Sequence, residues 1–203
     1  MGLTSLLFTH PLIFFLLVFL LLYSVIAHEV AHGLTALVFG DKTAKNAGRL
    51  SLNPLVHLDP LGTISLFLVG FGWARPVPVN YGALKKSRLA FIAVSLAGVL
   101  SNILIAAAAL FLLKFHSIDQ ETPLSMALLI AARINIILGA FNLIPIPPLD
   151  GSKVVMGFLP EAAQAGFVKL EPYGFLIILV LLYTGVLHPL IREIQQMLYA
   201  LIT

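Results

Sequence analysis

Cysteine is absent from this 203-residue chain, and charged residues are scarce. Without cysteine the chain forms no disulfide, has no thiolate nucleophile and binds no metal through sulfur. Charged residues make up 10% of the sequence and hydrophobic residues 60%. A soluble domain has about a quarter charged residues and about half apolar ones. The excess apolar residues lie in long blocks, which is typical of an integral membrane protein.

The N-terminal region lacks two features of a secretory signal peptide, a charged stretch before the apolar run and a small-residue cleavage site. We therefore expect a retained first helix over residues 11–38. The net charge is only +3, and the basic residues stand beside hydrophobic blocks instead of forming one patch. This distribution is typical of a protein in a lipid bilayer and argues against a nucleic-acid partner.

Five apolar segments divide the chain. None of them has the alternating pattern of barrel strands, and helices satisfy their own backbone groups in hydrocarbon. We therefore predict an all-α polytopic membrane protein with four to five transmembrane helices. The segments are Pro11–Phe39, Leu61–Trp73, Leu89–Phe115, Leu124–Leu143 and Tyr173–Leu187, the last of which can continue to Ile202.

The second segment is too short for a comfortable crossing, which needs about 20 residues. Basic residues flank it on both sides, and the positive-inside rule puts both flanks on the cytoplasmic side. We therefore expect a re-entrant or interfacial path for this segment. The flanking basic residues are Lys42, Lys45 and Arg49 before it, and Arg75, Lys85, Lys86 and Arg88 after it.

Two stretches around the second segment favour extended structure. Residues 46–60 interleave leucines with polar residues and contain two Asx-Pro pairs, and the prolines in residues 74–81 forbid a regular helix. We predict that the two stretches pair as a small β element at the membrane surface. The chain as a whole is predicted to be one domain over 1–203, with a catalytic core over about 11–158 and a C-terminal helix over about 173–202.

The pentapeptide His28-Glu29-Val30-Ala31-His32 lies inside the first apolar segment. On a helix, residues four apart share one face, so both imidazoles can bind a single Zn²⁺. The charge bias puts these histidines at the cytoplasmic end of the first helix and brings the end of the fourth segment to the same depth. Asp150 follows that segment, and a carboxylate at this depth is costly unless it is paired or binds a metal. Asp150 is therefore our candidate for the third ligand, and it can also cap a helix that runs to Phe158.

Glu29 is the candidate general base, which takes a proton from water and later passes it to a leaving amine. Asn142 and Asn102 are amides within apolar helices, and we expect them to stabilise the oxyanion or to contact substrate, or else to bond across helices. His57, in the extended region, is expected to be a structural or substrate-side group. Asn135 is expected to bridge helices.

Three stretches of this chain resemble the site-2 protease family of intramembrane zinc metalloproteases. The resemblance implies that His28, His32 and Asp150 bind one zinc ion, that Glu29 is the catalytic base, and that Asn142 stabilises the tetrahedral intermediate or positions substrate. Residues 97–102 depart from the family pattern, because Val99 stands where proline is usual. The matching stretches are HEVAH at 28–32, FNLIPIPPLDG at 141–151, and SLNPLVHLDPLGT at 51–63 with GWARPVPVN at 72–80.

These observations predict a zinc metalloendopeptidase that cuts membrane proteins or peptides within or next to their transmembrane segments. The resemblance implies a prokaryotic cytoplasmic membrane and a compact form without a PDZ or CBS domain, and the charge bias implies an active site towards the cytoplasm. Two alternatives stay open. One is a cation transporter or metal-handling protein that uses the same His/Asp cluster, since ionisable residues in membranes often mark ion pathways. The other is an inactive scaffold that binds membrane partners.

Overall fold

The computed structural model describes residues 3–69, 74–84, 87–115 and 122–203, and the regular elements in these ranges are helices. The long ones are α2, α6, α7, α9 and α10. The helices are α1 (Leu3–Thr9), α2 (Pro11–Val38), α3 (Thr43–Asn46), the 3-10 turn η1 (Pro54–Val56), α4 (Pro60–Val69), α5 (Tyr81–Leu84), α6 (Arg88–Phe115), α7 (Pro123–Asn142), α8 (Asp150–Phe158), α9 (Glu161–Tyr183) and α10 (Leu187–Ile202).

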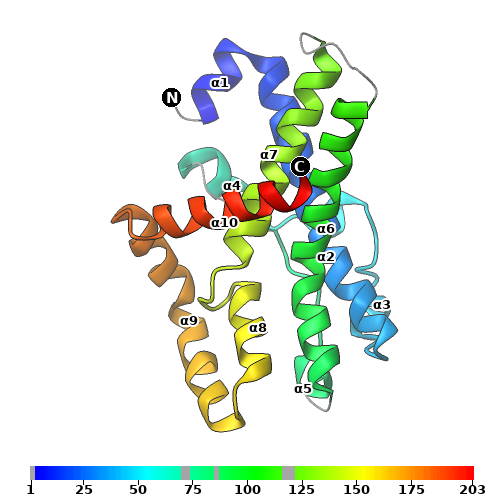
Figure 1. Ribbon diagram of the computed structural model, residues 1–203, viewed down its shortest axis with the longest axis vertical. Helices are drawn as coiled ribbons and strands as arrows, with labels where there is room; N and C mark the ends of the chain where they lie inside the picture. Colours follow the sequence, from blue (N-terminus) through cyan, green and yellow to red (C-terminus); the bar gives the residue numbers. More distant parts are fainter. Residues whose placement is uncertain (1–2, 70–73, 85–86, 116–121) are drawn as a thin grey trace.

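Helices α2, α6 and α7 form the centre of the molecule, with α6 packed against both of the others (Figure 1). Their starts follow local rules: Pro11 lies in the first turn of α2, and the Thr122 hydroxyl caps the Ser125 N–H at the start of α7. Small residues at the contact, such as Ala106 and Ala140, let the backbones approach closely.

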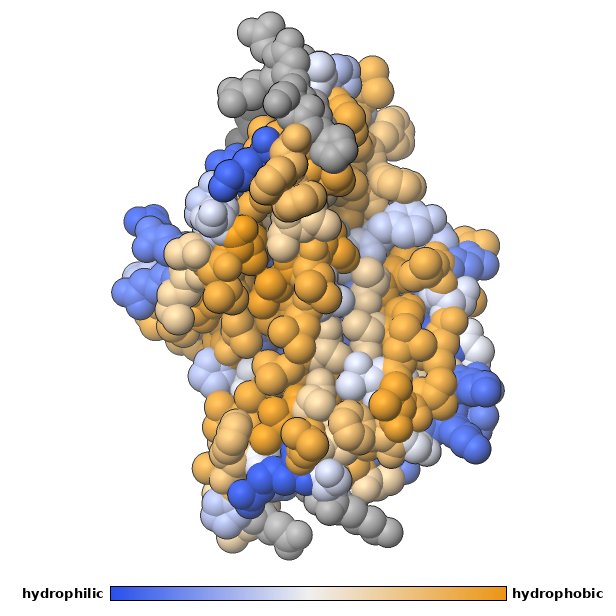
Figure 2. Space-filling view, turned by 45° about the vertical axis from the view of Figure 1, so that its right-hand side comes forward, coloured by the Kyte–Doolittle hydropathy of each residue, from blue (hydrophilic) through white to orange (hydrophobic). Residues whose placement is uncertain are grey.

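Within the described ranges, four helices are long and apolar enough to cross a membrane: α2, α6, α7 and residues 162–183 of α9. Helices α2 and α6 have 28 residues each, about 42 Å, which exceeds the roughly 30 Å of hydrocarbon in a bilayer. Apolar residues cover the middle of the face in Figure 2, and hydrophilic ones gather at its margins. The prediction of a helical membrane protein is therefore confirmed, with four candidate spans.

The C-terminal part differs from the sequence prediction. Helix α9 begins at Glu161, not near Tyr173, and contains Pro172 in its interior. The polar residues between 161 and 172 obscured this first half. A turn at Gly185, with φ of +80°, separates α9 from α10, so the region holds two helices instead of one. Helix α10 lies across the bundle and packs Leu198 against α6 and α7 (Figure 1).

The predicted β element is not seen in the part of the chain that the structure describes. Residues 43–46 and 54–56 are helical turns, and the pairing found between the two stretches is one isolated antiparallel bridge, Leu58–Ala74. Pro54 and Pro60 each begin a helical turn, because proline suits a first helical position as well as a strand edge. In the second apolar segment, residues 60–69 form α4, while 70–73 lie outside the described residues.

Asp41 ties the turn after α2 to residues 74–80. Its Oδ2 accepts a hydrogen bond from the Asn80 N–H at 2.7 Å, and its Oδ1 accepts from the N–H and hydroxyl of Thr43. Burial alone raises the pKa of a carboxyl, but the bonds from Thr43 and Asn80 outweigh it and hold the pKa of Asp41 below its ordinary 3.8. The charged form of Asp41 therefore stabilises this corner of the fold.

Replacing Asp41 by asparagine tests this contact. We expect D41N to lower the stability at pH 7 by about 1 to 2 kcal/mol, because bonds to a charged acceptor are lost. Since the folded pKa is depressed, the contribution is complete above pH 3.8 and falls as the pH drops through the folded value. The midpoint of thermal unfolding in detergent measures both effects. Equal midpoints for the two proteins at pH 7 contradict the assignment.

Candidate metal centre

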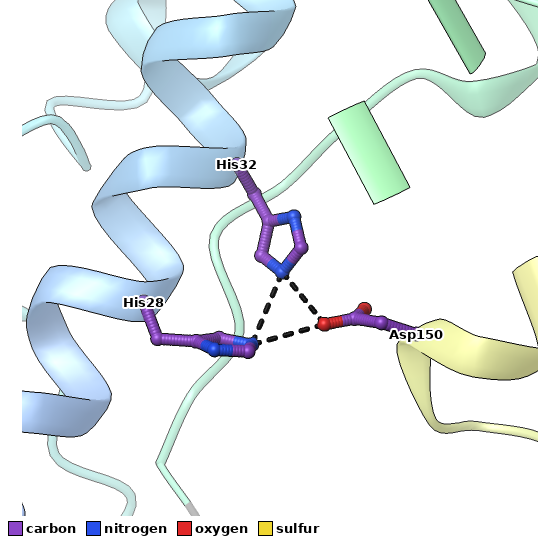
Figure 3. A group of neighbouring side chains, drawn as sticks. All are labelled: His28, His32 and Asp150. Atoms are coloured by element: carbon purple, nitrogen blue, oxygen red, sulfur yellow. Dashed lines mark hydrogen bonds and ion pairs between the residues drawn. The ribbon is translucent and has the colours of Figure 1, made fainter. Parts of the chain in front are cut away.

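His28, His32 and Asp150 meet in the interior of the bundle (Figure 3). The histidines lie one turn apart on α2, and Asp150 is the first residue of α8. The Asp150 Oδ2 lies 3.0 Å from His28 Nε2 and 2.9 Å from His32 Nε2, and the two Nε2 atoms are 3.1 Å apart. All three residues are at least 94% buried. The structure thus brings together the three residues that the sequence proposed as ligands.

The other ring nitrogen of each histidine identifies the tautomer. His28 Nδ1 lies 2.7 Å from the Asn102 Oδ1, and His32 Nδ1 lies 2.6 Å from the Val94 carbonyl oxygen. Because these oxygens accept, both Nδ1 atoms donate, and in the neutral rings both Nε2 lone pairs face the Asp150 oxygen. Three electron-rich atoms this close repel one another unless a proton or a metal ion lies among them.

This donor set fits Zn²⁺. Two imidazole nitrogens and one carboxylate oxygen are a catalytic zinc set, and tetrahedral bonds of about 2.0–2.2 Å put the ligand atoms about 3.3–3.5 Å apart. The observed separations of 2.9–3.1 Å need an outward movement of only a few tenths of an ångström. Histidines that bind zinc usually donate their other N–H to an oxygen, as both do here.

Gly98 on α6 makes room for the two imidazoles. A Cβ atom built on it would collide with His32 Nε2 and lie 2.5 Å from both His28 Nε2 and His28 Cε1. A side chain at this position would therefore occupy the space that the donor atoms share. Close packing of α6 against the histidine face of α2 depends on this glycine. Val99, where the family pattern has proline, lies within the continuous helix α6.

A chain of buried amides links His28 to α6 and α7. The Asn102 Nδ2 donates to the Asn135 Oδ1 at 2.8 Å, and the Asn135 Nδ2 donates to the Ser24 hydroxyl at 2.8 Å. Asn135 also donates to the Ala131 carbonyl. The prediction that Asn135 bridges helices is confirmed. Asn102, for which an oxyanion or substrate contact and a bond across helices were both open, has both ends of its amide engaged in this chain across helices.

The second oxygen of Asp150 contacts a residue that the sequence analysis did not single out. The Lys153 Nζ lies 3.2 Å from the Asp150 Oδ1 and 5.1 Å from the centre of the Tyr81 ring. The helix over 150–158 was expected, with Asp150 as its cap. Asp150 instead lies in the first turn, after Leu149 at the N-cap, where its charge suits the helix dipole. Lys153 follows Asp150 by three residues on this helix, and that spacing in the sequence could have predicted their contact.

Glu29 is half-buried and faces residues 74–80. Its Oε2 accepts a hydrogen bond from the Val77 N–H at 2.8 Å. Asn142 is also half-buried, at the end of α7, and its Nδ2 donates to the Leu138 carbonyl at 3.0 Å. His57 is fully buried, and its Nε2 donates to the Ser51 carbonyl at 2.7 Å. The side-chain hydrogen bonds described for Asn142 and His57 are thus within their own helix and loop.

A cavity of about 240 Å³ lies beside the centre, between α5, α6, α8 and α9. Lys153, the partner of Asp150, is part of its wall. Most of the lining is apolar, with Tyr81, Phe91, Met156 and Phe167 among the side chains. The cavity has space for a bulky apolar group, and the Lys153 side chain links its wall to the ligand candidate Asp150.

Known proteins that resemble this chain are named as zinc metalloproteases. The chain is 45% identical over 175 residues to "Putative zinc metalloprotease YwhC" of Bacillus subtilis (strain 168), covering 83% of this chain and 80% of that protein. It is 29% identical to "Putative zinc metalloprotease Rip2" of Mycolicibacterium smegmatis, over 82% of this chain and 66% of that protein. Zinc metalloprotease MJ0392 of Methanocaldococcus jannaschii is 28% identical over 77% of this chain and 38% of its own length. No solved structure matches the chain.

The sequence model described as Peptidase family M50 matches residues 116–184, which include Asp150 and Lys153. The match to the Bacillus subtilis protein covers most of both chains at an identity that leaves no doubt about common descent. With a His/His/Asp donor set inside a helical membrane protein, this chain belongs to peptidase family M50, the site-2 protease family of zinc metalloproteases.

Proposed function

We propose that the chain is an intramembrane endopeptidase that hydrolyses peptide bonds within or next to the transmembrane segments of membrane proteins. The observation that carries the proposal is the buried triangle of His28, His32 and Asp150 inside a bundle of apolar helices. A substrate that reaches these atoms has to enter from the membrane or its surface. The relatives named as zinc metalloproteases support the same reaction class.

In this proposal His28, His32 and Asp150 hold one zinc ion per chain. When bound, zinc supplies Lewis acidity, which makes water nucleophilic near neutral pH and polarises a carbonyl. The protein's own contribution is to hold the ligands in a buried, low-dielectric site with their tautomers fixed. Asn102 and the Val94 carbonyl hold the two imidazoles, and Lys153 holds the second oxygen of Asp150.

Glu29 is the proposed general base. It directly follows His28 on α2, and the Val77 N–H holds one of its carboxylate oxygens. The carboxylate takes a proton from the attacking water and gives it to the leaving amine. Asn142, at the end of α7, is proposed to contact the substrate or the developing oxyanion. For Asn102, the bonds to His28 and Asn135 support the alternative expectation of a bond across helices, in which it orients His28.

A helical substrate must unwind locally, because its carbonyls are otherwise hydrogen-bonded. One way to hold an extended substrate is strand addition to the edge of residues 46–80. Prolines at 76 and 78 have no N–H, and the Val77 N–H is bound to Glu29. Residues 76–78 thus have no free N–H to donate to an added strand. We favour the apolar cavity beside Lys153 as the place where a substrate side chain binds. The re-entrant path of α4, the cytoplasmic side of the site and a prokaryotic cytoplasmic membrane remain parts of the proposal.

The decisive test is Glu29→Gln with zinc quantified. We expect the purified E29Q protein to keep its zinc, because the three ligands are intact, and to lose all cleavage of a co-expressed membrane substrate. Metal analysis and immunoblotting of the substrate measure the two outcomes. Retained cleavage contradicts the assigned base. A cation flux in proteoliposomes, without proteolysis by the wild-type protein, instead favours a transporter.

Replacing Asn102 tests whether its hydrogen bond to His28 strengthens zinc binding. We expect N102L to weaken zinc binding about 10- to 100-fold, because the His28 Nδ1–H loses its acceptor. N102D keeps an acceptor oxygen and should stay close to the wild-type affinity. Competition with a chelator measures the affinity, and S101A, a change at the next residue of the same helix, is the control. Wild-type zinc affinity in N102L overturns the assigned role.

A further inference from the structure

Residues 74–80, which we call the strap, run beside α2 and have few free main-chain donors. Pro76 and Pro78 have no N–H, and the Arg75 N–H donates to the His57 carbonyl at 2.8 Å. The two remaining bonds described for strap N–H groups go to carboxylates: Val77 to Glu29 and Asn80 to Asp41. The strap therefore meets the proposed general base through one peptide N–H with prolines on both sides.

The Val77 side chain is fixed at the same place. Val77 is 94% buried and packs on Gly33, which lies one turn after Glu29 on α2. A Cβ atom on Gly33 would lie 2.8 Å from Val77 Cγ1 and 2.6 Å from Leu50 Cδ2, too close for either contact. Gly33 thus forms a notch that seats Val77. This notch and the N–H bond set the position of the strap against α2 independently of each other.

Arg49 holds the other side of the same peptide group. Its Nη2 donates to the Pro76 carbonyl at 3.1 Å and to the Arg75 carbonyl at 2.6 Å. The Pro76 C=O and the Val77 N–H belong to one trans peptide unit, so they point in opposite directions. A cation on the oxygen polarises the unit and strengthens the N–H as a donor. Arg49, the peptide and Glu29 thus form one continuous chain of hydrogen bonds.

We propose that Arg49 and the Pro76–Val77 peptide are positioning groups for Glu29 in proton transfer. This inference rests on the proposed function. A glutamate side chain has three rotatable bonds, and a general base works only when its oxygen lies within hydrogen-bond reach of the proton. Binding Oε2 to Val77 fixes the carboxylate and leaves Oε1 to accept the proton. The flanking prolines keep the strap extended and supply no competing donor.

Val77→Pro tests the peptide donor, because it removes the N–H from a segment that proline already suits. With a fluorescent single-span peptide that the wild-type protein cleaves and E29Q does not, we expect kcat to fall about ten- to a hundredfold. KM and zinc content should stay within about twofold. V77A keeps the N–H and is the matched control, expected within about threefold of wild type. Wild-type or higher kcat in V77P overturns the inference, the latter indicating that the strap inhibits Glu29.

Two further variants separate positioning from a merely structural role. R49M should lower kcat about tenfold at unchanged zinc content, R49K should recover part of the loss, and K45M, an exposed basic residue on α3, is the control. In the E29D background the carboxylate is shorter, so V77P should cost much less than in the wild type. Fully additive losses in E29D/V77P, or R49K as poor as R49M, overturn the inference.

These outcomes are distinct from failure of the proposed function. If the wild-type protein and E29Q cleave the peptide equally, the general base itself is misassigned. If E29Q is inactive while V77P and R49M retain the wild-type kcat, Glu29 acts without the strap, and only the inference of this section is lost. If V77P does not accumulate in membranes, the comparison of R49M with R49K decides alone.

Discussion

The structure depends on placing three lone-pair donors within about 3 Å of one another in an apolar bundle. An ionisable residue in hydrocarbon is costly, so each donor needs a partner on its far side. His28 has Asn102, His32 has the Val94 carbonyl, and Asp150 has Lys153. These partners leave one atom of each residue directed at the shared point. The arrangement is unfavourable on its own and becomes favourable around a cation, which accounts for zinc as the cofactor of this family.

Among the described residues, two systems of polar contacts lie on different parts of α2. Ser24, Asn135 and Asn102 connect α2, α7 and α6 behind His28 and fix its tautomer. Asp41, Glu29 and Arg49 hold residues 74–80 along the other part of α2. Hydrogen bonds between membrane helices, such as those of the first system, are modest in strength but directional. One system therefore orients a ligand, and the other orients the proposed base, while apolar contacts supply most of the packing.

Much of the architecture was predictable because hydrophobic blocks determine membrane helices directly. The helices over 11–38, 88–115 and 123–142 lie within a residue or two of the predicted segments. The prediction failed where polar residues interrupt an apolar pattern. Lys169, Glu171 and Pro172 concealed the first half of α9, and the prolines of residues 46–60 begin helical turns in place of strands. In both regions the residues are compatible with more than one backbone conformation, so local composition alone does not decide between them.

The sequence by itself determined the types of ligand. Two histidines four apart share one face of a helix, whatever that helix packs against. An aspartate at membrane depth is costly unless it is paired or binds a metal, which indicated Asp150. Only the tertiary structure decided what surrounds them. Gly98 and the Pro76–Val77 peptide have no motif of their own, and their roles arise where α6 and residues 74–80 meet α2, 48 or more residues away in the chain. Lys153 lies only three residues from Asp150, but its contact matters because Asp150 meets the histidines of α2 across 118 residues. Local periodicity specifies which face a residue takes, whereas the partner it meets depends on how whole helices pack.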